Sequence, residues 1–158
     1  MKRPKVTGDG IRVVFNAAEA ELLSRIAGQL AELLAGAEDQ VGDPALERLL
    51  PDGYRDNAAD AEEFRRFTQS ELVDDKVAGA ESIVAALAER TPTGEARLLL
   101  STPEAIRWLR SINDIRLTLA ARLGIVDESY RPSPDDDTFA IYAWLGQVQY
   151  ALLRAVDR

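Results

Sequence analysis

The clearest helical pattern of apolar residues in this chain lies between Thr102 and Gly124. At about 100° per residue, its apolar positions form one arc of roughly 200°, which is wider than the apolar stripe of an ordinary surface helix. Pro103 suits the first turn of such a helix, and Gly124 suits a left-handed position after its last turn. A helix with so wide an apolar arc is surrounded by other elements, so we expect this central helix, 102–124, to form the centre of the core.

Other segments carry helix and strand patterns of their own. Asn16 followed by Glu19 matches a capping box, so a helix is expected to begin directly after Asn16. Residues 96–100 fit either a strand paired with 11–15 or an extended lead into the central helix. The patterns together predict helices over 17–35, 44–50, 58–90 and from 134 to the C-terminus, and strands over 5–6 and 11–15.

The apolar side chains of segment 58–90 do not keep to one side of a helix. Phe64 and Phe67 lie on one side of a straight helical wheel, whereas Val73 and Val77 lie roughly on the opposite side. One straight helix cannot bury both sets against a single neighbour. Either the helix kinks or breaks around 70–75, or its two ends pack on different elements. We favour the second alternative, with a bend.

These elements predict a mainly α fold. We expect about five helices packed around the central helix, with a small β element contributed by the N-terminus. A length of 158 residues suits a single domain over 1–158, which is long enough to bury a substantial core.

The composition narrows the possible chemistry. The chain has no cysteine and no histidine, which excludes disulfides, thiol switching, the usual zinc ligands and imidazole acid–base catalysis. We therefore expect a protein that is not an enzyme and needs no cofactor. The net charge of −8 opposes binding to the phosphate backbone of DNA, so specific DNA binding is not expected and a protein partner is favoured.

The N-terminal residues and the hydropathy pattern bear on location. No apolar run approaches the roughly 20 residues that span a bilayer, so no membrane partner is expected. The charged first residues are not followed by the apolar segment of a secretory signal. We expect a cytoplasmic protein.

Two polar residues, Arg116 and Asn113, fall inside the apolar arc of the central helix, while Asp114 faces the solvent side of the wheel. A buried guanidinium costs several kcal/mol unless it is paired and hydrogen-bonded. Acids of the charge-dense stretch before residue 67, Asp56 and Asp60 among them, are its natural partners. We predict a structural polar cluster of these four residues; in the alternative, a carboxylate of a ligand or partner reaches Arg116.

Arg107, Arg110 and Arg122 lie outside the apolar arc and form the arginine-rich surface of the central helix. Such a surface could meet an acidic patch on a partner or, as the second hypothesis, nucleic acid. Glu104 interrupts it and no aromatic residue is interleaved, which is typical of ordinary solvated charge.

The acids at 135–137 invite a metal interpretation. Their spacing lacks the alternating oxygen ligands, the glycine and the terminal glutamate of an EF-hand loop. Acids at the start of a helix are explained by the helix dipole alone. No metal site is predicted, and without a convergent carboxylate motif a metal-dependent hydrolase is not expected.

Three stretches of the chain resemble a known family. They are LLPDGYRDNAADAEEFRRF at 49–67, WLRSINDIRLTLAARLGI at 108–125 and YAWLGQVQYALLRAV at 142–156. In these stretches the chain is similar to an uncharacterised actinobacterial family usually encoded beside the ClpS adaptor, the AosR-like oxidative-stress regulators. The resemblance covers nearly the whole chain.

The resemblance implies a transcription co-regulator that works through an extracytoplasmic-function sigma factor. In the redox-sensing branch of the family this action depends on a cysteine pair, which the present chain lacks. The implied function is therefore regulation by protein–protein binding without a thiol switch, with a sigma factor or a Clp-system component as partner. The alternative is a DNA-binding transcriptional regulator that uses the Arg107, Arg110 and Arg122 surface.

Overall fold

The fold is mainly α, as the sequence predicts. A computed structural model of the chain describes residues 1–40, 42–50 and 62–158, the side chains of 62–68 excepted. Within these residues it contains five α-helices, a short 3-10 helix and three strands. In chain order the elements are β1 (Lys2–Thr7), β2 (Gly10–Phe15), α1 (Ala17–Ala35), η1 (Ala37–Asp39), α2 (Pro44–Leu49), α4 (Glu62–Ala86), β3 (Ala96–Leu100), α5 (Thr102–Leu123) and α6 (Asp137–Val156).

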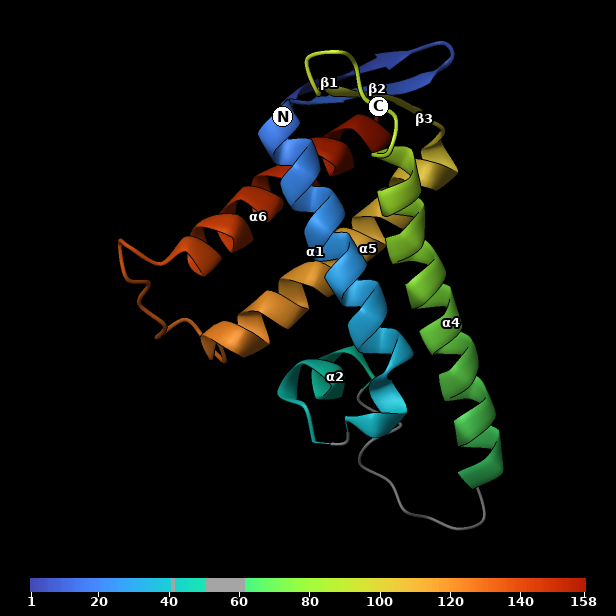
Figure 1. The fold of residues 1–158 in the computed structure, drawn as a ribbon, viewed down its shortest axis with the longest axis vertical. Coiled ribbons are helices and arrows are strands. Elements are labelled where there is room, and N and C mark those ends of the chain that lie inside the picture. The colour runs from blue at the N-terminus through green and yellow to red at the C-terminus, as the bar shows by residue number, and fades with distance from the viewer. Residues whose placement is uncertain (41, 51–61) are drawn as a thin grey trace.

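The three strands form one antiparallel sheet in the order β1-β2-β3. Ile11, Val13 and Phe15 alternate with outward residues and are buried, because a strand turns every second side chain toward the core. The sheet covers one end of the helical body, where both chain termini also lie (Figure 1). The strands predicted at 5–6 and 11–15 are confirmed and pair with each other, and 96–100 is a strand paired with β2 rather than an extended lead-in.

Helix α5 lies at the centre of the fold and contacts every other described α-helix as well as β2 and β3. The Ser101 hydroxyl accepts a hydrogen bond from the Glu104 backbone while the Glu104 carboxylate reaches back to Ser101, which fixes the first turn. Gly124 ends the helix with φ 74°, a left-handed conformation that glycine adopts without strain. The prediction of a central helix over 102–124 is confirmed.

Three aromatic side chains join the sheet to α5 and α6. The Phe15 ring of β2 stacks on Trp108 of α5, with 6.1 Å between ring centroids. Trp144 of α6 meets the same Phe15 edge-on, with centroids 6.5 Å apart. Offset and edge-to-face pairs of this kind contribute about 0.5–1.5 kcal/mol beyond the burial of area. They hold the sheet against the two helices.

Helices α1 and α4 pack side by side in front of α5 (Figure 1). The capping box at Asn16 and Glu19 is present, as predicted. Helix α4 runs from Glu62 to Ala86 without interruption, so the alternative of a break around 70–75 is excluded. No proline or glycine lies between residues 62 and 78, so nothing there interrupts the backbone hydrogen bonds. The expected start at residue 58 and the aromatic side chains at 64 and 67 lie outside what the structure describes.

The buried face of α5 is turned further toward α4 than the apolar arc predicts. Ile106, which belongs to the arc, is 37% exposed, whereas Ser111 and Asp114 are buried. The cause is a close approach of α4 at Gly79. A Cβ atom at that position would lie 2.6 Å from the Ser111 hydroxyl oxygen, so only glycine lets the two helices meet there.

We expect Gly79→Ala to destabilise the chain by about 1–2 kcal/mol, although alanine is the better helix former, because overpacking outweighs the gain in propensity. Urea unfolding followed by circular dichroism measures the effect. Adding Ser111→Ala removes the obstructing oxygen and should recover most of the loss. Gly28→Ala on α1 is the matched control: its Cβ would meet nothing within 4 Å, so it should stabilise. A stabilising Gly79→Ala would contradict the close approach.

Candidate functional site

The antiparallel pair α5 and α6 holds most of the polar residues singled out in the sequence. Arg116 of α5 is half-buried and donates a hydrogen bond from Nη1 to the Gln149 Oε1 of α6 at 2.9 Å. Its guanidinium carbon lies 4.4 Å from the centre of the Tyr142 ring, a cation–π geometry. Gly146 has no side chain that would fill the space beside this group. Arg116 therefore ties α5 to α6.

The neighbours of Arg116 in the structure are uncharged. No carboxylate of the described residues forms an ion pair with it, and its buried Nε has no hydrogen-bond partner there. Asp56 and Asp60 lie outside the described residues, so their pairing with Arg116 stays a prediction. The guanidinium charge is balanced here by an aromatic face and an amide, which cost less to bury than a carboxylate.

The positions of Asn113 and Asp114 are reversed relative to the sequence analysis. Asn113 is exposed and accepts a long hydrogen bond, 3.4 Å, from the Gln149 side chain. Asp114 is only 6% exposed and receives the Lys76 ammonium of α4 on both carboxylate oxygens, at 2.8 and 2.9 Å. The correction has a physical reason: α4 packs on this side of α5 and brings a cation with it.

The Asp114 carboxylate carries a net electrostatic cost. Burial raises its pKa above the ordinary value, and the hydrogen bond and charge of Lys76 offset this only in part. The two residues are 38 positions apart on different helices, so their pairing had no signal in the sequence. Asp114 and Lys76 make a structural contact between α4 and α5.

The predicted arginine surface is divided in the structure. Arg107 and Arg110 are exposed and form no ion pair within the described residues. Arg122 instead donates two hydrogen bonds to Asp43, at 3.0 and 2.8 Å, which join the end of α5 to the start of α2. The bond from Arg122 is the main cause of the lowered pKa of Asp43. Arg122 therefore stabilises the fold and is not free to meet a partner.

The α5–α6 face, as we call the exposed side of this helix pair, carries three exposed large apolar side chains. Ile106, Tyr150 and Leu153 are 37%, 63% and 47% exposed. Arg110 and Asn113 of α5 are also exposed. Aromatic and arginine side chains are enriched at the energetic centres of protein interfaces. The chemistry of this face suits the binding of a protein.

The sequence analysis missed the contribution of α6 to this face. Tyr142, Gly146, Gln149 and Leu153 recur at intervals of three and four residues, so they form one stripe of that helix. The stripe meets Arg116 and Asn113 of α5 at Gln149. This spacing was the signal available in the sequence.

A groove, the acidic side chains and the helices of the described residues also bear on the sequence predictions. A groove of about 230 Å³ between α1 and α5 is lined mainly by Ile26, Leu30, Leu33, Ile115 and Leu119. No cluster of acidic side chains able to hold a metal ion is present in the described ranges. Asp136 caps α6 by accepting hydrogen bonds from the backbone of Thr138 and Phe139, so a helix cap explains it. None of the described helices is both long and apolar enough to cross a bilayer.

The fold and this surface define a mainly helical protein that presents an apolar face with amide groups on α5 and α6. The chain belongs to the family described as a domain of unknown function, DUF2017, which matches residues 1–156. Relatives from Mycobacterium bovis and Mycobacterium tuberculosis named oxidative stress regulator AosR are each 28% identical over 185 residues, covering 93% of this chain and 83% of the relative.

A relative from Mycobacterium leprae, also named AosR, is 31% identical over 143 residues, covering 77% of this chain and 62% of that protein. The predicted membership of the AosR-like family is confirmed by these matches. No solved structure matches the chain.

Lys76→Met should cost about 2–4 kcal/mol at neutral pH, because Asp114 then stays buried without a counter-charge. The 20% exposure of the Lys76 side chain keeps the loss below that of a fully buried pair. The raised pKa means that the folded chain binds the Asp114 proton more tightly than the unfolded chain does. The variant should therefore regain stability as the pH falls from 7 toward about 4.

Chemical denaturation at several pH values tests this expectation. The double variant Lys76→Met with Asp114→Leu removes both charges and should recover most of the loss at pH 7, roughly as an apolar replacement of a buried ion pair does. A loss for Lys76→Met that is the same at pH 5 and pH 7 would show that Asp114 does not titrate as described.

Arg116→Met should cost about 1–2 kcal/mol, because it removes one hydrogen bond and one cation–π contact but leaves no opposite charge stranded. Arg110→Met, on the exposed side of the same helix, should change the free energy of unfolding by less than about 0.5 kcal/mol. Urea unfolding of both variants measures these changes in the free energy of unfolding. A loss of about 3–5 kcal/mol for Arg116→Met would instead indicate a carboxylate partner such as Asp56 or Asp60.

Proposed function

We propose that this chain is a non-enzymatic, cytosolic regulator that acts by binding another protein. The observation that carries the proposal is the α5–α6 face, where Ile106, Tyr150 and Leu153 are exposed together on one helix pair. Leaving such side chains in water is unfavourable, so a partner that covers them gains free energy on binding. The names of the mycobacterial relatives support a regulatory role in oxidative stress.

The partner proposed is a sigma factor of the extracytoplasmic-function class, as the family resemblance implies. The chain would act as a transcription co-regulator at the promoter through that protein. With no cysteine in its sequence, it would bind its partner whatever the oxidation state of the cell. A Clp-system component is the other partner that the resemblance suggests.

Direct DNA binding through Arg107, Arg110 and Arg122 is disfavoured on two grounds. Arg122 is held by Asp43, so its charge is neutralised locally. The net charge of −8 also repels the DNA backbone at long range. Two exposed arginines alone supply few of the phosphate contacts on which non-specific affinity depends.

Titration calorimetry with purified extracytoplasmic-function sigma factors from the same genome tests the proposal. We expect one of them to bind, with an affinity that peroxide treatment of the chain leaves unchanged. Tyr150→Glu with Leu153→Glu should weaken this binding about tenfold or more, because charges then enter the apolar face.

The matched control is Leu72→Glu with Val126→Glu, which adds the same charge at two exposed apolar side chains away from the face. It should leave the affinity within about twofold. Binding to no sigma factor and no Clp component, or equal weakening by both double variants, would contradict the proposal.

A further inference from the structure

The outward side of the sheet gathers positive charge in an acidic protein. Because Ile11 and Val13 point inward, Arg12 points outward, and the strand register places Lys5 and Leu99 on either side of it. Two residues further along β2, Val14 also points to this side, and the register places Lys2 and Arg97 on either side of it. We call these six residues the outer sheet face: Lys2, Lys5, Arg12, Val14, Arg97 and Leu99.

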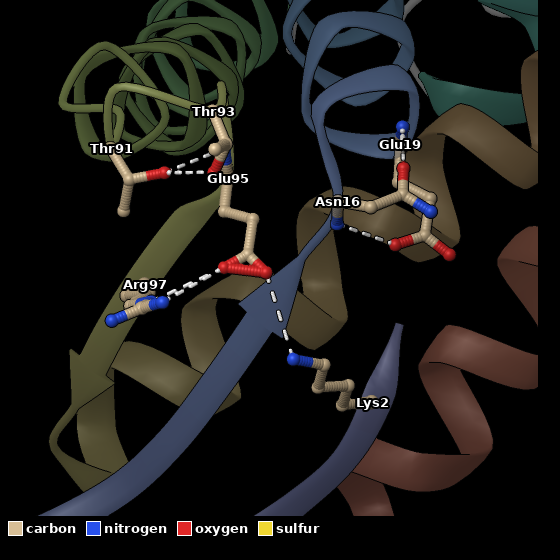
Figure 2. Close-up of polar contacts among 7 residues, drawn as sticks. All are labelled: Lys2, Asn16, Glu19, Thr91, Thr93, Glu95 and Arg97. Carbon is tan, nitrogen blue, oxygen red and sulfur yellow. Dashed lines mark hydrogen bonds and ion pairs between the residues drawn. The ribbon is translucent and has the colours of Figure 1, made fainter.

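One acidic residue beside this face, Glu95, forms ion pairs with two of its cations. Figure 2 shows Glu95 between Lys2 and Arg97, with carboxylate oxygens 3.6 Å from the Lys2 ammonium and 3.1 Å from Arg97. Lys5 and Arg12 form no ion pair with any described residue. The face therefore carries four cations against one carboxylate, in a chain whose 27 acidic residues outnumber its 19 basic ones.

The pairing of Lys5 with Arg12 works against the stability of the sheet. The two residues are direct cross-strand partners between β1 and β2. Like charges placed directly opposite each other on one face destabilise a strand pair. An acidic side chain at either position would relieve the repulsion. A bound anionic group would relieve it equally well.

We propose that the outer sheet face binds an acidic segment of a protein partner, with carboxylates near Lys5 and Arg12 and an apolar side chain on Leu99. Leu99 is 52% exposed between the cations, which suits an apolar side chain of the segment. That the partner is a protein follows from the proposed function, and this proposal rests on it.

Protein is favoured over nucleic acid by the make-up of the face. Single-stranded nucleic acids bind to sheets through aromatic side chains on which bases stack, and none of the six residues is aromatic. Duplex DNA is repelled at long range by the net charge of the chain. An acidic peptide needs only local charge complementarity and short apolar contacts, both of which this face supplies.

The test uses synthetic probes, so it does not depend on any particular sigma factor. A fluorescent peptide in which glutamate alternates with valine and threonine is titrated with the full chain, and anisotropy is measured. Matched probes carry glutamine for glutamate, or are single-stranded DNA of similar length. We expect the acidic peptide to bind about tenfold more tightly than either matched probe, with an affinity that falls as salt rises.

Lys5→Glu with Arg12→Glu should weaken binding of the acidic peptide about tenfold or more, because the charge of the face is reversed. The matched control, Arg25→Glu with Arg131→Glu, changes the net charge equally at exposed positions outside the face and should stay within about twofold. Should the reversed variant fail to fold, Lys5→Gln with Arg12→Gln takes its place with a smaller loss.

The melting temperature is a second readout, and it tests whether Lys5 and Arg12 repel each other across the strands. Lys5→Glu alone should raise the melting temperature, because it replaces a repulsive cross-strand pair by an attractive one, while it weakens peptide binding. Equal binding by the reversed and control variants, tighter binding of single-stranded DNA than of the acidic peptide, or a lowered melting temperature for Lys5→Glu would overturn the proposal. Sigma-factor binding that survives those results would leave the proposed function standing.

Discussion

Helix α5 has to be shielded from water along most of its length, and the arrangement of the other elements follows from that requirement. The sheet covers its beginning, α1 and α4 cover one side, α2 covers its end and α6 runs alongside it (Figure 1). Each neighbour has an apolar face of its own to bury against it. The other described helices and the sheet are therefore arranged around α5.

On the side of α5 that is enclosed in this way, each buried or half-buried polar residue lies against a neighbouring helix. Asp114 pairs with Lys76, the Ser111 hydroxyl occupies the space that a side chain at position 79 would need, and Arg116 lies over the Tyr142 ring. Each solution comes from a different part of the chain, and each fixes the position of one neighbouring helix along α5. Polar groups thus determine how the helices align, while apolar burial supplies the driving force.

Local patterns predicted the elements well and their contacts poorly. The capping boxes at Asn16 and Ser101 and the glycine at Gly124 fix helix ends through neighbours a few residues away, so they can be read from sequence. The choice between Asn113 and Asp114 as the buried residue depends on Lys76, which lies in another helix. Single-sequence periodicity cannot supply such a contact between helices.

The central place of α5 also has a consequence for the order of synthesis. The elements that enclose it, from β1 through β3, leave the ribosome before α5 does, at about 5–20 residues per second. For seconds, the residues of α1 and α4 that pack on α5 lack that partner. A nascent chain of this protein therefore presents exposed apolar surface to chaperones and proteases until its middle helix arrives, and premature termination would yield a fragment without a core.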